Sequence, residues 1–133
     1  NIEACRILSQ CFRKTKGEAQ ALGALFRSFL YDAPRAEVCC DIGNIFLEQG
    51  SYQTAAYWYL RALDTEPREK GGGFTDHKAY GFLPAIQLAV CYDRLGDTET
   101  AARYNELAGS YDPGSDAYLH NKQYFDSLLR NKN

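Results

Sequence analysis

The chain has 133 residues, of which 45% are hydrophobic and 24% charged, a composition that suits one globular domain with its own core. The formal net charge is −2 and the 15 lysines and arginines are scattered, which argues against nucleic acid or an anionic membrane as the main partner. No apolar run reaches the roughly 18–20 residues of a membrane-spanning helix, and no segment resembles a signal peptide. We therefore expect a cytoplasmic domain. The start at Asn1, in a chain without methionine, suggests a fragment of a longer polypeptide.

The cysteines argue against two common uses of thiols. Their number is odd, which does not suit a secreted disulfide framework, and no pair has the C-x-x-C spacing of a zinc site. We expect reduced thiols that mostly pack as small apolar side chains, and we expect no metal ion or other cofactor. The five are Cys5, Cys11, Cys39, Cys40 and Cys91.

Residues 1–35 predict a pair of helices. The helices are expected at Ile2–Lys16 and Glu18–Tyr31, separated by Gly17 and closed before Pro34. The pair is about as long as one of the repeats that follow it, but its small residues match the small-residue positions of those repeats poorly. We interpret it as a degenerate first repeat.

Two later segments, 36–69 and 82–115, share one pattern. Small residues, large apolar residues, a glycine and a proline recur at the same positions when the segments are aligned from Ala36 and Phe82. In the first segment these residues are Ile42, Gly43, Phe46, Gly50, Ala55, Tyr59, Ala62 and Pro67. In the second they are Leu88, Ala89, Tyr92, Gly96, Ala101, Asn105, Ala108 and Pro113. Only Asn105 departs from the expected type, because an aromatic residue is usual at its position.

Each part of this pattern has a physical reason. Small side chains let two antiparallel helices approach closely, and large apolar groups fill the remaining space. The glycine ends the first helix in a left-handed conformation, Ser51 and either Asp97 or Thr98 then cap the second helix, and the proline stops it. The pattern resembles the tetratricopeptide repeat (TPR), which implies an all-α solenoid of helical hairpins in a right-handed superhelix. Ser115 would begin a capping helix within 116–133, so we expect about seven helices.

Residues 70–81 form an insert between the two repeats. Its three consecutive glycines predict a flexible connection, whereas Phe74, Tyr80 and the following Phe82 suggest that the segment packs back on the domain. A loop inserted in a repeat protein often carries its specialised function. The insert is therefore a candidate contact surface.

A more specific resemblance includes this insert. The run from Tyr80 to Asp97, with Asp76 and His77 before it and Tyr104–Ala108 after it, is similar to the repeat region that follows the catalytic domain of some bacterial family-2 glycosyltransferases. Asn105 fits this group of sequences. The resemblance implies an accessory part of a sugar transferase, because the chain has neither the Asp-x-Asp motif nor the βαβ pattern of the catalytic domain.

Two sets of residues admit a functional and a structural interpretation. The adjacent Asp76 and His77 could be a base and its orienting group, or loop residues that cap a helix or touch a neighbouring domain. No nucleophile with supporting groups is evident, so we assign no catalytic residue. Several aromatic side chains could stack on a sugar or could simply fill repeat cores. They are Tyr52, Tyr57, Trp58 and Tyr104.

The candidate partner-binding residues combine the insert with the first helix of each repeat. This surface is largely apolar in the second repeat, which suits a helix, an adjoining domain or a second subunit, and it lacks the basic groups that hold a C-terminal carboxylate. We predict a non-catalytic interaction module from a bacterial family-2 glycosyltransferase. It would mediate self-association, with a homodimer as one form, or position an acceptor or other protein partner. A stand-alone adaptor for a peptide or protein is the alternative. The candidates are Asn44, Glu48, Phe74, Asp76, His77, Tyr80, Leu83, Ile86, Gln87, Val90 and Arg94.

Overall fold

The computed structural model describes residues 2–15, 17–30, 35–65 and 80–131, and within these ranges the regular structure is entirely helical. Seven α-helices follow one another within the described residues, in line with the sequence prediction of about seven. They are α1 (Ile2–Thr15), α2 (Glu18–Arg27), α3 (Ala36–Glu48), α4 (Tyr52–Asp64), α5 (Phe82–Arg94), α6 (Thr98–Tyr111) and α7 (Asp116–Arg130). The second predicted helix ends earlier than expected, because a 3₁₀ turn, η1 (Ser28–Leu30), replaces its last part.

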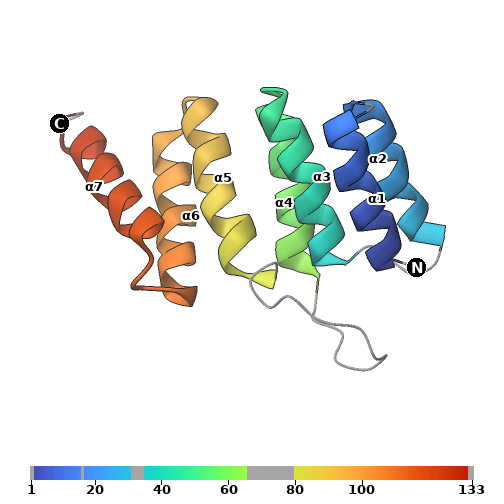
Figure 1. The fold of residues 1–133 in the computed structure, drawn as a ribbon. Coiled ribbons are helices and arrows are strands. Elements are labelled where there is room, and N and C mark those ends of the chain that lie inside the picture. Colours follow the sequence, from blue (N-terminus) through green and yellow to red (C-terminus); the bar gives the residue numbers. More distant parts are fainter. Residues whose placement is uncertain (1, 16, 31–34, 66–79, 132–133) are drawn as a thin grey trace.

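The helical hairpins follow one another along a single array, and each helix packs mainly on its neighbours in the sequence (Figure 1). In the figure α3 passes in front of α4. Helix α5 packs extensively against both α4 and α6, whereas α2 packs much less against α3. The first hairpin is thus joined less firmly to the array than the later hairpins are to each other.

Glycine closes the first helix of each full repeat, as predicted. Gly50 and Gly96 have φ values of 78° and 87°, in the left-handed region that side chains with a Cβ avoid. The amide after each glycine donates to a carbonyl of the preceding turn, from Ser51 to Phe46 O and from Asp97 to Tyr92 O, both at 2.9 Å. These bonds satisfy carbonyls that the helix end leaves open.

The predicted N-caps are confirmed for two helices and wrong for one. The Asp97 carboxylate accepts a hydrogen bond from the Thr100 amide, and the Ser115 hydroxyl accepts one from the Tyr118 amide. Ser51 occupies the N-cap position of α4, but its side chain makes no capping hydrogen bond. Asp97 has a similar backbone conformation, with ψ of 78° against 70° for Ser51, so the backbone angle does not account for the difference between the two caps.

The small residues of the repeat pattern lie where the helices cross. Those in the second helices are fully buried alanines, and Gly43 in α3 faces the buried ring of Tyr59. A Cβ added to Gly43 would lie 2.8 Å from Cε1 of that ring, well inside the ordinary carbon–carbon contact distance. The buried alanines are Ala55, Ala62, Ala101 and Ala108.

Asn105 has a structural explanation for its departure from the pattern. Its side chain is 1% exposed, and its Nδ2 donates to the backbone carbonyl of Tyr118 at 3.1 Å. An amide in this position therefore ties α6 to the first turn of α7, a contact that an aromatic ring would not make.

The described cysteines are all free thiols, and three of them are buried as expected. Burial raises the pKa of Cys39 and of Cys91 to about 11, and raises that of Cys40 further. Cys5 is half-buried and Cys11 is exposed. In the part of the chain that is described, no helix has both the length and the apolar character needed to cross a membrane.

Candidate functional site

One stripe of side chains on α3 and a matching stripe on α5 form the main candidate surface, which we call the first-helix face. Residues spaced by three or four positions share one side of a helix. Along α5 most of these side chains are half-buried and Arg94 is exposed; along α3, Glu48 is exposed. The face consists of Asp41, Asn44 and Glu48 from α3 and of Leu83, Gln87, Val90 and Arg94 from α5.

The two stripes differ in chemistry although they occupy corresponding repeat positions. Asn44 corresponds to Val90, and Glu48 corresponds to Arg94. Helix α3 contains three carboxylates and no lysine or arginine, whereas the stripe on α5 is mainly apolar and ends in one guanidinium. The face is therefore polar along α3 and mainly apolar along α5.

Asp41 belongs to this face but was not among the predicted residues. Its Oδ2 accepts a hydrogen bond from Arg6 Nε of α1 at 2.6 Å, and each side chain is 21% exposed. Burial alone would lower the pKa of Arg6, but the bonds to Asp41 outweigh it and the pKa is raised. The sequence did hold a signal, since Asp41 precedes Asn44 by three residues on the same side of the predicted helix.

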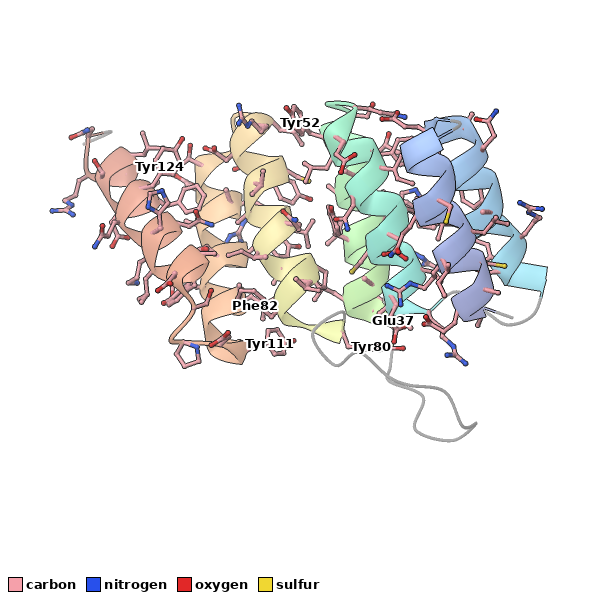
Figure 2. All side chains as sticks on the ribbon, viewed as in Figure 1. Glu37, Tyr52, Tyr80, Phe82, Tyr111 and Tyr124 are labelled. Carbon is pink, nitrogen blue, oxygen red and sulfur yellow. The ribbon has the colours of Figure 1, made fainter. Side chains whose placement is uncertain are left out.

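Asn44 and Tyr80, both predicted contact residues, make internal hydrogen bonds. The Tyr59 hydroxyl donates to Asn44 Oδ1, and the Asn44 Nδ2 group takes no part in this bond. The Tyr80 hydroxyl donates to the Glu37 carboxylate at 3.2 Å, and the two residues lie beside each other at the lower edge of the molecule in Figure 2, near the middle of the array. Glu37 is only 5% exposed, and burial together with this carboxylate raises the pKa of Tyr80 to about 12. Tyr80 thus fastens the end of the insert to the start of α3.

The predicted residues of α5 do not all reach the surface. Leu83, Gln87 and Val90 are half-buried. Ile86 is 8% exposed and packs with Ala85 and Ala108 in a cluster between α5 and α6, so it contributes to the core more than to the face.

Three other predicted residues, Phe74, Asp76 and His77, lie outside the described residues. The described remainder of the chain contains no group of three histidine, cysteine or acidic side chains arranged to hold a metal ion.

The last helix borders the face through Tyr124. Its hydroxyl donates to Asp93 of α5 at 3.0 Å, while the ring remains 44% exposed (Figure 2). The carboxylate raises the pKa of Tyr124. This hydrogen bond links α7, which packs mainly on α6, to the last turn of α5.

An exposed aromatic cluster lies elsewhere, on α2 and α4. The ring centroids of Phe26 and Trp58 are 5.9 Å apart, and those of Tyr57 and Trp58 are 5.3 Å apart. Tyr57 is 54% exposed, so its ring remains accessible, as the interpretation that these aromatic side chains stack on a sugar requires. The ring of Tyr104 instead stacks on that of Tyr92, with the ring centroids 5.5 Å apart, and fills space between helices. Tyr104 therefore fits the interpretation that aromatic side chains fill the repeat cores.

Two open hollows lie on the α6 side of the molecule, away from the first-helix face. One has a volume of about 200 Å³ and runs along Thr100, Arg103, Tyr104 and Leu107. The other has a volume of about 620 Å³ between α6 and α7. It is lined by Glu99, Ala102, Arg103, Glu106, Asp126 and Leu129.

Comparison with known proteins gives matches among solved structures only. No protein-family model and no curated protein matches the sequence. A structure of MamA AMB-1 superposes with a TM-score of 0.72 at 15% sequence identity, over 97% of this chain. The second TPR domain of human RPAP3, in complex with the HSP70 peptide SGPTIEEVD, superposes with a TM-score of 0.71 at 14% identity, over 95% of this chain and 98% of that one.

The fold is a TPR-type helical solenoid. This confirms the all-α architecture predicted from the repeat pattern. The chain spans 64% of the MamA chain that it matches. These matches lend no support to the expected glycosyltransferase parent, which has the sequence resemblance alone behind it.

Proposed function

We propose that the chain is a protein-interaction module that binds a segment of another polypeptide on the first-helix face. The observation that carries this proposal is the pair of matched stripes on α3 and α5, where polar and apolar side chains reach the surface at corresponding positions of two repeats. The TPR domain of RPAP3, which has the same fold, was solved with a peptide bound, and this supports a peptide-binding role for the fold here.

The parent protein in this proposal is a bacterial family-2 glycosyltransferase, and the chain itself has no catalytic role. The sequence from Tyr80 to Asp97 supports this assignment through its resemblance to the repeat region of such enzymes. The module would mediate self-association or hold an acceptor protein near the catalytic domain, in the cytoplasm.

A stand-alone adaptor is the second candidate function. It is favoured by one structural neighbour, the RPAP3 TPR domain, which was solved with a bound peptide. The two proposals differ in the domain that accompanies the module in its reading frame. A nucleotide-sugar-binding domain encoded beside this segment would support the transferase, and its absence would support the adaptor.

The first experiment is a selection of binding peptides from a display library on the immobilised chain. We expect enriched peptides whose binding weakens in the Val90→Arg variant, because a long charged side chain would cover the middle of the face. The matched control is Ala102→Arg on α6, which changes a half-buried residue outside the face. Failure to enrich any peptide, or equal binding to both variants, would contradict the proposed use of this face.

Light scattering over a range of concentrations then tests self-association. A stable dimer would support self-association. A monomer at every concentration would contradict self-association and would support the binding of a separate protein partner. Circular dichroism of each variant shows whether the helical fold is retained.

A further inference from the structure

We propose that a second surface, separate from the first-helix face, binds an acidic segment of a protein partner that also carries an aromatic side chain. This surface lies on the second helices of the first two hairpins, and we call it the second-helix face. The inference goes beyond the proposed function and does not depend on it. The face consists of Gly23, Phe26 and Arg27 from α2 and of Tyr57, Trp58 and Arg61 from α4.

Aromatic rings join the two helices across this face and remain partly open to solvent. Trp58 is half-buried and contacts both Phe26 and Tyr57, and its ring stands nearly perpendicular to that of Tyr57, with an interplanar angle of 87°. Phe26 is 41% exposed and Tyr57 is 54% exposed. Tyrosine and tryptophan, together with arginine, often dominate the binding energy of protein interfaces. An aromatic side chain of a partner could pack on these rings and remove their remaining surface from water.

Two open guanidinium groups flank the rings. Arg27 and Arg61 are exposed, and each is the tenth residue of its helix, so they occupy equivalent positions on neighbouring second helices. Arg61 follows Tyr57 by one turn of α4, and Arg27 follows Phe26 directly. Among the residues that the structure describes, neither guanidinium takes part in an ion pair. Because a guanidinium can bind a carboxylate through two parallel hydrogen bonds, the two open groups favour acidic side chains on the partner.

The carboxylates of α2 and α4 do not pair with these two arginines. Glu18 lies in the first turn of α2, at the opposite end from Arg27, and its carboxylate accepts a hydrogen bond from Gln49. Asp64 ends α4 close to Arg61 in sequence, but the two side chains form no ion pair. A carboxylate that stays in water weakens the attraction of a nearby cation only modestly, because the dielectric constant of the solvent is high. Both arginines therefore remain available to a partner.

Gly23 leaves the backbone of α2 open in the middle of this face. It precedes Phe26 and Arg27 by about one turn, so it lies on the same side of the helix. A Cβ at this position would meet nothing within 4 Å, so the packing of the chain does not require a glycine here. A missing side chain lets another backbone approach a helix closely. A segment that crosses α2 at Gly23 can therefore lie against Phe26 and bring its carboxylates to the arginines.

The charges favour an acidic peptide over single-stranded nucleic acid, which also binds to aromatic rings beside cations. A nucleic-acid strand carries a phosphate at every nucleotide, and its affinity depends on the number of phosphates that cations neutralise. The second-helix face offers two arginines, and the whole chain has a net charge of −2. A peptide needs only one carboxylate for each arginine.

A partner that contacts both α2 and α4 would also strengthen a weakly packed junction of the array. Helix α2 packs much less against α3 than α4 packs against α5. Binding across the two second helices adds contacts where the first hairpin has few. It should therefore slow amide hydrogen exchange in the first hairpin as well as in α4.

The test selects random dodecapeptides, displayed on phage, that bind the complete wild-type chain. Counter-selection on the Arg27→Glu/Arg61→Glu double variant removes peptides that bind elsewhere, including those that bind the first-helix face. We expect the retained peptides to have a net negative charge and to contain an aromatic residue. Their binding should weaken as salt is added and should slow hydrogen exchange in α1, α2 and α4.

Binding titrations with a retained peptide then measure each part of the face. Binding should weaken about three- to tenfold in Arg61→Glu, since an exposed ion pair contributes little and a reversed charge also repels. It should weaken about tenfold in Tyr57→Ala. It should weaken at least about threefold in Gly23→Ala, although alanine should make the fold more stable, so this loss cannot arise from unfolding. Arg130→Glu, at the end of α7, makes the same charge change outside the face and should alter binding by less than about 1.5-fold.

Three results of these experiments would overturn the inference: no retained peptide, retained peptides without acidic residues, or equal binding to wild type and Gly23→Ala. A single-stranded DNA twelvemer that binds the wild type and not the double variant would assign the face to nucleic acid. Dimerisation that slows exchange in α2 and α4 would assign it to a second copy, and either assignment would also overturn the inference. The first-helix face is tested separately by Val90→Arg, so these results leave the proposed function intact.

Discussion

The contact between Gly43 and Tyr59 gives the sharpest test of how the repeats pack. Replacing an exposed glycine within a helix by alanine normally stabilises a protein by about 0.5–1 kcal/mol, because alanine loses less backbone entropy. Gly23 of α2 meets this condition, since a Cβ there would have no neighbour within 4 Å. At Gly43 the same Cβ would lie 2.8 Å from Cε1 and 2.9 Å from Cζ of Tyr59.

The cost of the collision at Gly43 can be bounded. The Tyr59 ring is fully buried and its hydroxyl is bonded to Asn44, so it cannot swing away without losing packing and a hydrogen bond. Forcing one extra methyl group into a well-packed core costs about 1–3 kcal/mol. Gly23→Ala and Gly43→Ala gain the same helix propensity, so Gly43→Ala should be less stable than Gly23→Ala by about 1–3 kcal/mol.

Urea unfolding followed by circular dichroism measures this difference directly, provided that the slope with urea is unchanged. A double-mutant cycle with Tyr59→Leu isolates the contact, because the collision should disappear when the ring is removed. If the two alanine variants have equal stability, the close approach of α3 and α4 through a small residue is not what the repeat pattern encodes.

Three further predictions concern pH, the first hairpin and helix caps. Burial raises the pKa of Cys91 to about 11 from an unfolded value of 9.0, so the stability that this thiol contributes is complete below pH 9 and is lost as the pH rises towards 11. In urea titrations at several pH values over this range, the free energy of unfolding of Cys91→Ala should therefore fall less with pH than that of the wild type. Arg6→Gln should weaken the docking of α1 on Asp41 by about 1–3 kcal/mol. We expect faster amide hydrogen exchange that is confined to α1 and α2, and equally faster exchange in all helices would contradict this prediction. Asp97→Ala should lower the free energy of unfolding by about 1 kcal/mol and Ser51→Ala by much less, and equal losses would show that the hydrogen bond of the cap is not decisive.

The aligned repeats predicted the local features of the fold. Gly50 and Gly96 mark the helix ends because only glycine adopts the left-handed conformation at no steric cost, and this depends on the residue itself. The spacing of small and large residues likewise predicted which helix sides would meet, because that spacing follows from the geometry of a single helix. Ser51 shows the limit of such local inference, because a good capping residue stands in the N-cap position of α4 and yet its side chain makes no capping hydrogen bond.

Which residues of the candidate face remain at the surface was decided by distant parts of the chain. Ile86 was predicted on the face from its position in α5, but it is covered in the cluster with Ala108 of α6. Asp41 was not among the residues predicted for the face, and its ion-pair partner Arg6 lies in the first, degenerate repeat.

The sequence by itself determined the all-α architecture, the helix order and the hairpin turns, since these follow from periodicity and from the conformations open to single residues. Only the tertiary structure decided that Asn105 holds α7, that Tyr80 is tied to Glu37, and that Arg6 of α1 pairs with Asp41 of α3. The reason is physical. Burial and hydrogen bonding depend on which elements pack against one another across the array, and no local spacing specifies that.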